Sequence, residues 1–255
     1  MQSDELRMFL SMSSDNRAVL TDYTAMEAYK GDTLVSIQAS WVVLRDFPKQ
    51  VLVLKGTKDA GLIDPRAPGI ADRLVWKEET RAVPGYVRAL DRAAAGEQSI
   101  IKQLLDRGQW ARSHMEWMLA RSGDMHLSIQ EFAEVFTQAE PTRMRRKERW
   151  KRETAEKFFG LVNTMARISF NAHPSKPVWP ARKHRFNHLL FRHAAAYAFY
   201  MLQLIQRGAT TRKAETVRND AVDVVIATYA TYFNGLMSED NQASIIHHLA
   251  RFFLS

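Results

Sequence analysis

The chain has 255 residues, a net charge of +8 and no cysteine, and 46% of its residues are hydrophobic. The absence of cysteine excludes disulfides and thiolate metal sites, and it fits a reducing compartment. No basic segment followed by an apolar run opens the sequence, and the longest apolar stretch, residues 194–202, is too short to cross a bilayer. We therefore expect a soluble, cytoplasmic protein that does not enter a membrane.

Three short apolar segments predict strands, at residues 17–21, 51–54 and 236–238. Continuous apolar strands of this kind are typical of parallel sheets that are covered on both faces. Between the first two segments, helical periodicity runs over residues 24–45, with a break near Gly31. A strand, a helical crossover and a second strand together predict a right-handed βαβ unit.

The middle of the chain predicts helices. Residues 58–85 are rich in Pro, Gly and Asp, which indicates a loop with one short helix at 70–76. After it, helical periodicity alone is visible, and helices are expected at residues 86–106, 109–121, 128–138, 142–170, 181–207, from Thr210 or Thr211 to about Phe233, and 242–253. The expected organisation is a discontinuous α/β unit, residues 1–57 and 209–255, around a mainly helical insertion, residues 58–208.

The insertion carries the positive charge of the chain. Residues 141–193 contain 14 Lys/Arg against 3 Glu and no Asp, a net charge of +11, so the rest of the chain carries −3. Such asymmetry favours a surface that binds polyanions. Arg145, Arg146 and Arg149 lie beside Trp150, and basic residues next to an aromatic ring are typical of sites that bind a phosphate backbone and stack a base. The alternative is a solvated helical face with Trp150 in the core.

Acidic residues gather near the two ends of the chain. Asp22 follows the first predicted strand, at the sheet edge where open α/β folds bind ligands, and Glu27 lies on the next helical turn. Asp220 and Asp223 are three residues apart and share a helix face, while Asp240 follows the third predicted strand. Carboxylate oxygens are typical ligands of Mg²⁺ and Mn²⁺, which activate water for phosphoryl transfer. The simpler alternative for Asp22 is a helix N-cap.

These acidic blocks resemble the PIN-domain family of nucleases. The family pattern has an Asp at the end of the first strand, an acid on a nearby helix, a helix start of the type Asn/Asp-Asp-x-x-Asp, and a Thr/Ser-x-Asp strand end. The matching segments are Thr21-Asp22, Glu27, Asn219-Asp220-Ala221-Val222-Asp223 and Ser238-Glu239-Asp240. They span roughly residues 15–55 and 210–255, and the long insertion departs from the compact members of the family.

The resemblance implies a three-layer α/β/α fold with a parallel sheet and a large helical insertion. It implies an endonuclease that hydrolyses RNA, more than DNA, by a two-metal mechanism. The implied catalytic carboxylates are Asp22, Glu27, Asp220, Asp223 and Asp240, of which all except Glu27 would bind Mg²⁺ or Mn²⁺. Asn219 and Ser238 are the implied substrate contacts, and Glu131 or Glu134 is an alternative to Glu27.

The family includes toxins of toxin–antitoxin pairs, so the resemblance also implies a toxin or defence effector. Candidate partners are then a nucleic acid, an antitoxin or other protein, and a second copy of the chain. A competing interpretation is a catalytically inactive PIN-like module that binds RNA or a protein through the basic helical lobe. The spacing from Arg182 to His188 also resembles that of the metal-independent HEPN ribonucleases.

Overall fold

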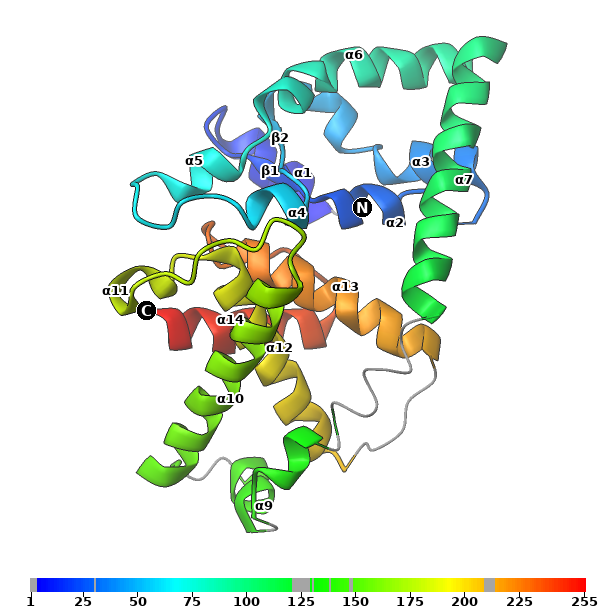
Figure 1. The fold of residues 1–255 in the computed structure, drawn as a ribbon. Coiled ribbons are helices and arrows are strands. Elements are labelled where there is room, and N and C mark those ends of the chain that lie inside the picture. The colour runs from blue at the N-terminus through cyan, green and yellow to red at the C-terminus, as the bar shows by residue number, and fades with distance from the viewer. Residues whose placement is uncertain are drawn as a thin grey trace. The chain divides into compact units, whose positions relative to one another are not determined.

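The computed structural model describes residues 4–29, 31–120, 129, 131–137, 139–146, 149–208 and 214–255 (Figure 1). The chain divides into two compact units. Unit 1 contains Met1–Gly56 and Ala71–Trp117, and unit 2 contains Thr57–Ile70 and Met118–Ser255. None of the helices in these described ranges is both long enough and apolar enough to cross a membrane.

The described chain is mainly helical, and the expected three-layer α/β/α fold is wrong. Its sheet has two parallel strands, β1 (Ala18–Leu20) and β2 (Val51–Val53). The third predicted strand, residues 236–238, is irregular chain between two helices. Met237 and Ser238 are exposed there, so this segment lacks the continuous burial that a central parallel strand requires.

The predicted strand–helix–strand arrangement of unit 1 is confirmed as a parallel pair. Residues 18, 19 and 20 pair with residues 51, 52 and 53. The connection contains α2 (Asp22–Glu27), α3 (Thr33–Ser40) and two short 3-10 helices, η1 (Leu44–Asp46) and η2 (Pro48–Gln50). Thr21 and Asp32 cap α2 and α3 by accepting hydrogen bonds from main-chain N–H groups of the first turn.

The outer edge of β2 is closed by the chain that follows it. Val53 N donates to Thr80 Oγ1 at 3.0 Å, and Trp76 N donates to Val53 O at 2.8 Å. The remaining helices of this unit are α1 (Asp4–Met12), α5 (Ile70–Leu74, which starts in unit 2), α6 (Lys77–Ala94) and α7 (Gln98–Ala120, which ends in unit 2). Buried side chains of α1, α6 and α7 form one core with those of α3 and β2.

Helix boundaries in unit 1 differ from the prediction, and α6 already begins at Lys77, inside the segment 58–85 that was expected to be mostly loop. The chain breaks between α6 and α7 at Gly96, which has φ +91°, and α7 continues through Gly108. Gly108 is therefore not a helix break. A Cβ at this position would lie 2.4 Å from Thr33 Oγ1, so Gly108 lets α7 approach α3 closely.

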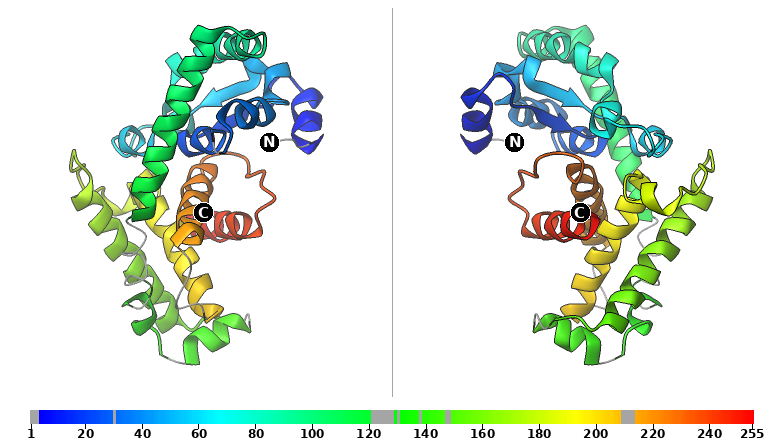
Figure 2. Two further views of the ribbon diagram at one scale, coloured as in Figure 1. Left: turned by 90° about the vertical axis from the view of Figure 1, so that its right-hand side faces the viewer. Right: turned by 90° about the vertical axis from the view of Figure 1, so that its left-hand side faces the viewer.

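Unit 2 is built around α12 (Leu189–Gln206). This helix packs against α9 (Ala139–Arg145), α10 (Arg152–Ala172), α13 (Ala214–Ala230) and α14 (Asn241–Leu254). Figures 1 and 2 show α12 in the middle of this group. The unit also contains the short helices α4 (Thr57–Ala60) and α11 (Arg182–Arg185).

The residues of α12 explain its central position. Residues 198–204 are all buried, so no side of the helix faces solvent over these two turns. Ala194, Ala195, Ala196 and Ala198 are small, which lets neighbouring helices approach closely. Because α13 and α14 pack on α12, residues 214–255 belong to unit 2, while β1 and β2 belong to unit 1. The two ends that were expected to form one α/β unit thus lie in different compact units.

Replacing Gly108 with Ala should destabilise unit 1. The added methyl group collides with Thr33, and overpacking of this kind costs about 1–3 kcal/mol, against a gain of up to about 1 kcal/mol in helix propensity. Thermal unfolding followed by circular dichroism should show a lower midpoint for Gly108→Ala than for the wild type.

Gly160→Ala is the matched control, because Gly160 lies inside α10 and a Cβ there meets no atom within 4 Å. It should leave the midpoint unchanged or raise it. Adding Thr33→Ala to Gly108→Ala removes the closest atoms and should recover part of the loss. Equal midpoints for Gly108→Ala and Gly160→Ala would contradict the close contact.

Candidate functional site

Asp22 lies where the two parallel strands end. Thr21, between β1 and α2, caps the helix, and Asp22 is the first residue of α2. Asp22 Oδ1 accepts a hydrogen bond from Tyr23 N at 2.9 Å. Its Oδ2 lies 3.0 Å from the position that a Cβ would take on Gly56, a few residues past β2. The carboxylate therefore sits at the carboxyl edge of the strand pair, as expected, and it is Thr21 that caps the helix.

Glu27 ends α2 in the same unit and is half-buried. The alternatives to it, Glu131 and Glu134, are exposed and lie in unit 2. Asp22 and Glu27 are thus the two predicted acids that share one compact unit and one short helix.

Asp220 is a buried carboxylate on α13. It is 7% exposed and lies on the same helix face as the buried residues Val217 and Val224. The hydroxyl of Tyr200, on α12, donates to Asp220 Oδ2 at 2.8 Å. An ionised group at such a position is costly unless polar partners compensate, which singles out Asp220 among the predicted acids. Asp223, one turn later, is half-buried, and Asn219 is exposed and accepts hydrogen bonds from Arg218.

The third acidic block has a local structural role. Asp240 caps α14, because its Oδ1 accepts from Gln242 N at 2.6 Å and from Ala243 N at 3.0 Å. Ser238 Oγ in turn accepts from Asp240 N at 3.1 Å. Both residues are exposed, so helix capping accounts for the polar residues that had predicted a strand end.

The predicted ligands do not form a metal site within one unit. Across the described ranges, no group of three or more His, Asp or Glu side chains is arranged to hold a metal ion. Asp22 and Glu27 belong to unit 1, whereas Asp220, Asp223 and Asp240 belong to unit 2. The described residues of either unit alone do not fit the expected Mg²⁺ or Mn²⁺ centre.

An aromatic array lies beside Asp22 and was not expected from the sequence. Trp110 and His114 stack on α7, with ring centroids 5.7 Å apart and planes 20° apart. The His114 ring meets Tyr23, the residue after Asp22, edge to face at a centroid distance of 6.4 Å. Trp110 is 64% exposed, so one large ring of this array faces solvent. The only sequence signal was an i, i+4 aromatic pair on a helix, which does not indicate its neighbours.

The basic segment is only partly described. Arg146 and Arg149 are exposed, and the side chain of Arg145 lies outside the described part. Trp150 meets Phe158 edge to face, with ring centroids 5.4 Å apart, and packs on the core of unit 2. The interpretation of Trp150 as a core residue is therefore confirmed.

His188 has a structural role rather than that of an exposed base. It caps α12 by accepting from Leu190 N, and it packs on Phe170 with ring centroids 4.4 Å apart. Burial, together with the charge of nearby His173, lowers the pKa of His188 to about 4. This environment does not favour the metal-independent alternative.

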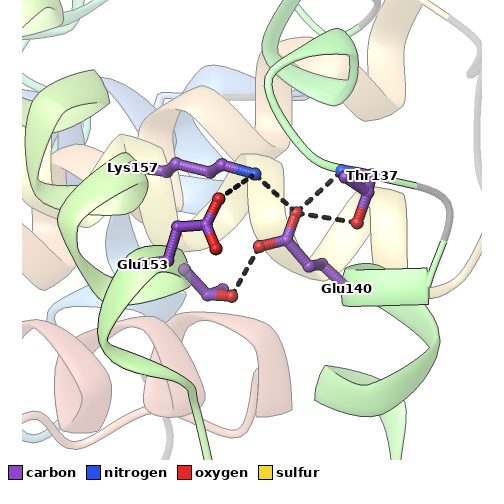
Figure 3. Close-up of polar contacts among 5 residues, drawn as sticks. Thr137, Glu140, Glu153 and Lys157 are labelled. Carbon is purple, nitrogen blue, oxygen red and sulfur yellow. Dashed lines mark hydrogen bonds and ion pairs between the residues drawn. The ribbon is translucent and has the colours of Figure 1, made fainter.

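Glu140 is a carboxylate that the sequence analysis did not single out. Its side chain is 11% exposed and joins α9 to α10 (Figure 3). It accepts from Thr154 Oγ1 at 2.5 Å, from Thr137 N at 2.8 Å, and from Thr137 Oγ1 and Lys157 Nζ at 3.0 Å. Burial alone would raise the pKa of Glu140, but these donors outweigh it and lower the pKa to about 2.

Comparison with known proteins identifies no relative: no family model, no curated protein and no solved structure matches this chain.

Glu140→Gln should destabilise unit 2 at neutral pH. The depressed pKa means that Glu140 contributes stability above its unfolded-state value of 4.5, and this contribution is lost as the pH falls towards about 2. After allowance for solvent screening, the loss at pH 7 should be on the order of 2 kcal/mol. Urea unfolding at pH 7 and pH 3 should show a smaller difference between variant and wild type at the lower pH.

Glu153→Gln tests the same lysine from an exposed position. Glu153 is 79% exposed and lies 3.9 Å from Lys157 Nζ, so its loss should cost less than about 0.5 kcal/mol. Equal effects of the two substitutions would show that the hydrogen bonds of Glu140 do not stabilise the protein.

Proposed function

We propose that this protein is a metal-dependent nuclease that hydrolyses phosphodiester bonds in single-stranded RNA, with Asp22 as a catalytic carboxylate. The observation that carries the proposal is the position of Asp22 at the carboxyl edge of the parallel pair. There its Oδ2 faces Gly56, next to the end of β2. Ligands of α/β proteins bind at this edge, so a substrate phosphate has access to the carboxylate.

Mg²⁺ or Mn²⁺ is the proposed cofactor, because carboxylate oxygens are the ligands that these ions prefer. When bound, such an ion activates water and stabilises the charge of phosphoryl transfer. Asp22 and Glu27, both in unit 1, are the candidate ligands. Because the described residues hold no group of three possible ligands, the position of Asp22 is the main support for the proposal.

The aromatic array supports a nucleic acid as the substrate. An exposed indole such as Trp110 can stack on a base, and stacking needs bases that are free of a duplex. Trp110 contacts His114, and His114 contacts Tyr23, the neighbour of Asp22. The backbone of a nucleic-acid strand whose bases stack on these rings would therefore approach the Asp22 carboxylate. The net charge of +8 favours the same polyanionic substrate.

Asp22→Asn should reduce the cleavage of single-stranded RNA by at least about 100-fold, since the amide keeps the shape but removes the charge. Cleavage should be measured with a labelled RNA oligonucleotide in Mg²⁺ or Mn²⁺, and EDTA should abolish it in the wild type. The control is Asp15→Asn, because Asp15 is exposed before β1, at the opposite end of the strand pair. Undiminished cleavage by Asp22→Asn would refute the proposal.

Trp110→Ala should weaken substrate binding without changing the chemical step. Base stacking contributes about 1–3 kcal/mol per base, so KM should rise roughly 5- to 150-fold while kcat stays within about twofold. Phe252→Ala is the matched control, because Phe252 is also a strongly exposed aromatic residue but lies on α14. A loss in kcat with an unchanged KM would argue against stacking by Trp110.

A second candidate is a protein that binds RNA through its basic lobe without cleaving it. The observation that favours it is the lack of a three-ligand group in the described ranges. RNA binding by the wild type with no cleavage in either Mg²⁺ or Mn²⁺ would select this candidate.

A further inference from the structure

An arginine–tryptophan cluster lies in unit 2, outside the sites considered so far. It consists of Arg167 on α10, Arg182 and Arg185 on α11, and Trp179 between the two helices. The guanidinium carbons of Arg167 and Arg185 lie 4.5 and 4.7 Å from the centroid of the Trp179 ring. Cation–π contacts of this kind fix the two charged groups over one aromatic side chain.

The position of Arg185 is set by a further contact. Its Nη1 donates to Asn163 Oδ1 at 2.7 Å, and Asn163 Nδ2 donates to Phe159 O at 2.8 Å on the same helix. The guanidinium is therefore held in place from two sides. Burial, and then the positive charges of nearby Arg167 and Arg182, lower the pKa of Arg185.

The cluster has no acidic partner among the described residues. Five other arginines of the described chain do pair with acids, at Arg7–Asp46, Arg45–Asp91, Arg66–Asp64, Arg92–Glu97 and Arg152–Glu156. In the part of the chain that is described, no carboxylate makes an ion pair with Arg167, Arg182 or Arg185. Three interacting cations without an acid are unfavourable unless an anion joins them.

Two buried hydrogen-bond donors of the cluster also indicate a ligand. Arg185 Nε and Trp179 Nε1 are buried, and neither has an acceptor among the described residues. Buried donors are rarely left in this state in a folded protein, and an unsatisfied one often marks the place of an ion or a water molecule. Arg167 and Arg182 are exposed, so a ligand can reach the cluster from solvent.

We propose that the Arg167–Trp179–Arg182–Arg185 cluster is a binding site for a phosphate group. Guanidinium groups match phosphate oxygens in geometry, and they keep their charge at all physiological pH values. Arg167 and Arg182 bind the phosphate at the solvent-exposed side of the cluster. Arg185 is half-buried and adds positive charge to the site. The phosphate belongs either to a nucleic-acid backbone or to a small phosphorylated compound, and the two share this recognition chemistry.

The site does not depend on Asp22 or on any cleavage activity. It also differs from the predicted contacts Arg145, Arg146 and Arg149, which precede α10. A protein that fails to cleave RNA can still bind phosphate here, so the two proposals can fail separately.

The test is a comparison of the double variant Arg167→Gln/Arg182→Gln with the wild type. Binding of inorganic phosphate should be measured by calorimetry, and binding of a labelled single-stranded RNA oligonucleotide by fluorescence anisotropy in EDTA. We expect Kd to rise at least 10-fold for one or both probes. If the oligonucleotide is the ligand, the log–log salt slope should fall by about 0.7 for each backbone phosphate that the variant no longer neutralises.

Arg152→Gln is the matched control, because Arg152 also lies on α10 and is 93% exposed, but it pairs with Glu156. It removes a single arginine charge outside the cluster and should change Kd less than twofold. Weaker binding of inorganic phosphate identifies a small phosphorylated compound as sufficient, and weaker binding of the oligonucleotide alone identifies a backbone.

Equal effects of the double variant and Arg152→Gln would overturn the proposal, since general electrostatics would then account for binding. Unchanged binding of both probes in the double variant would overturn it as well. Arg182→Gln alone, at an exposed position on a four-residue helix, provides a variant that keeps the Arg167–Trp179 contact if the double variant unfolds.

Discussion

The burial of residues 198–204 of α12 on all sides is the constraint on which unit 2 depends. A helix segment without a solvent-facing side requires neighbours around its whole circumference. The helices α9, α10, α13 and α14 supply these neighbours. The hydroxyl of Tyr200 is a polar group inside this shell, and its partner is the carboxylate of Asp220. Removing that acid would therefore leave a buried hydroxyl to find another acceptor.

The sequence correctly predicted the strands and helices whose formation depends mainly on neighbouring residues. The apolar runs at 17–21 and 51–54 correctly predicted β1 and β2, because a buried strand is the usual place for several adjacent branched residues. The last helix was predicted within one residue at either end, since its helical periodicity is visible in the sequence. The position of Asp22 at the strand edge followed from the same reasoning.

The failures concern features that distant parts of the chain determine. Leu236 and Met237 resemble a strand, but the described sheet ends with β1 and β2, and Asp240 behind them caps a helix. Gly108 resembles a helix break because a glycine that breaks a helix and one that permits close contact have the same local sequence. The arginine–tryptophan cluster brings together residues from two helices and a proline-rich link, and no spacing rule connects them.

The closed edge of β2 has a consequence for self-association. A strand from another molecule can extend a sheet only where main-chain N–H and C=O groups are unpaired. On the outer side of β2, Val53 already uses both groups, with Thr80 and Trp76 as partners. A strand added on this side would have to displace the Thr80 hydroxyl and the Trp76 N–H from Val53. At Val53 the two-stranded sheet is therefore protected against the edge-to-edge pairing that leads to aggregation.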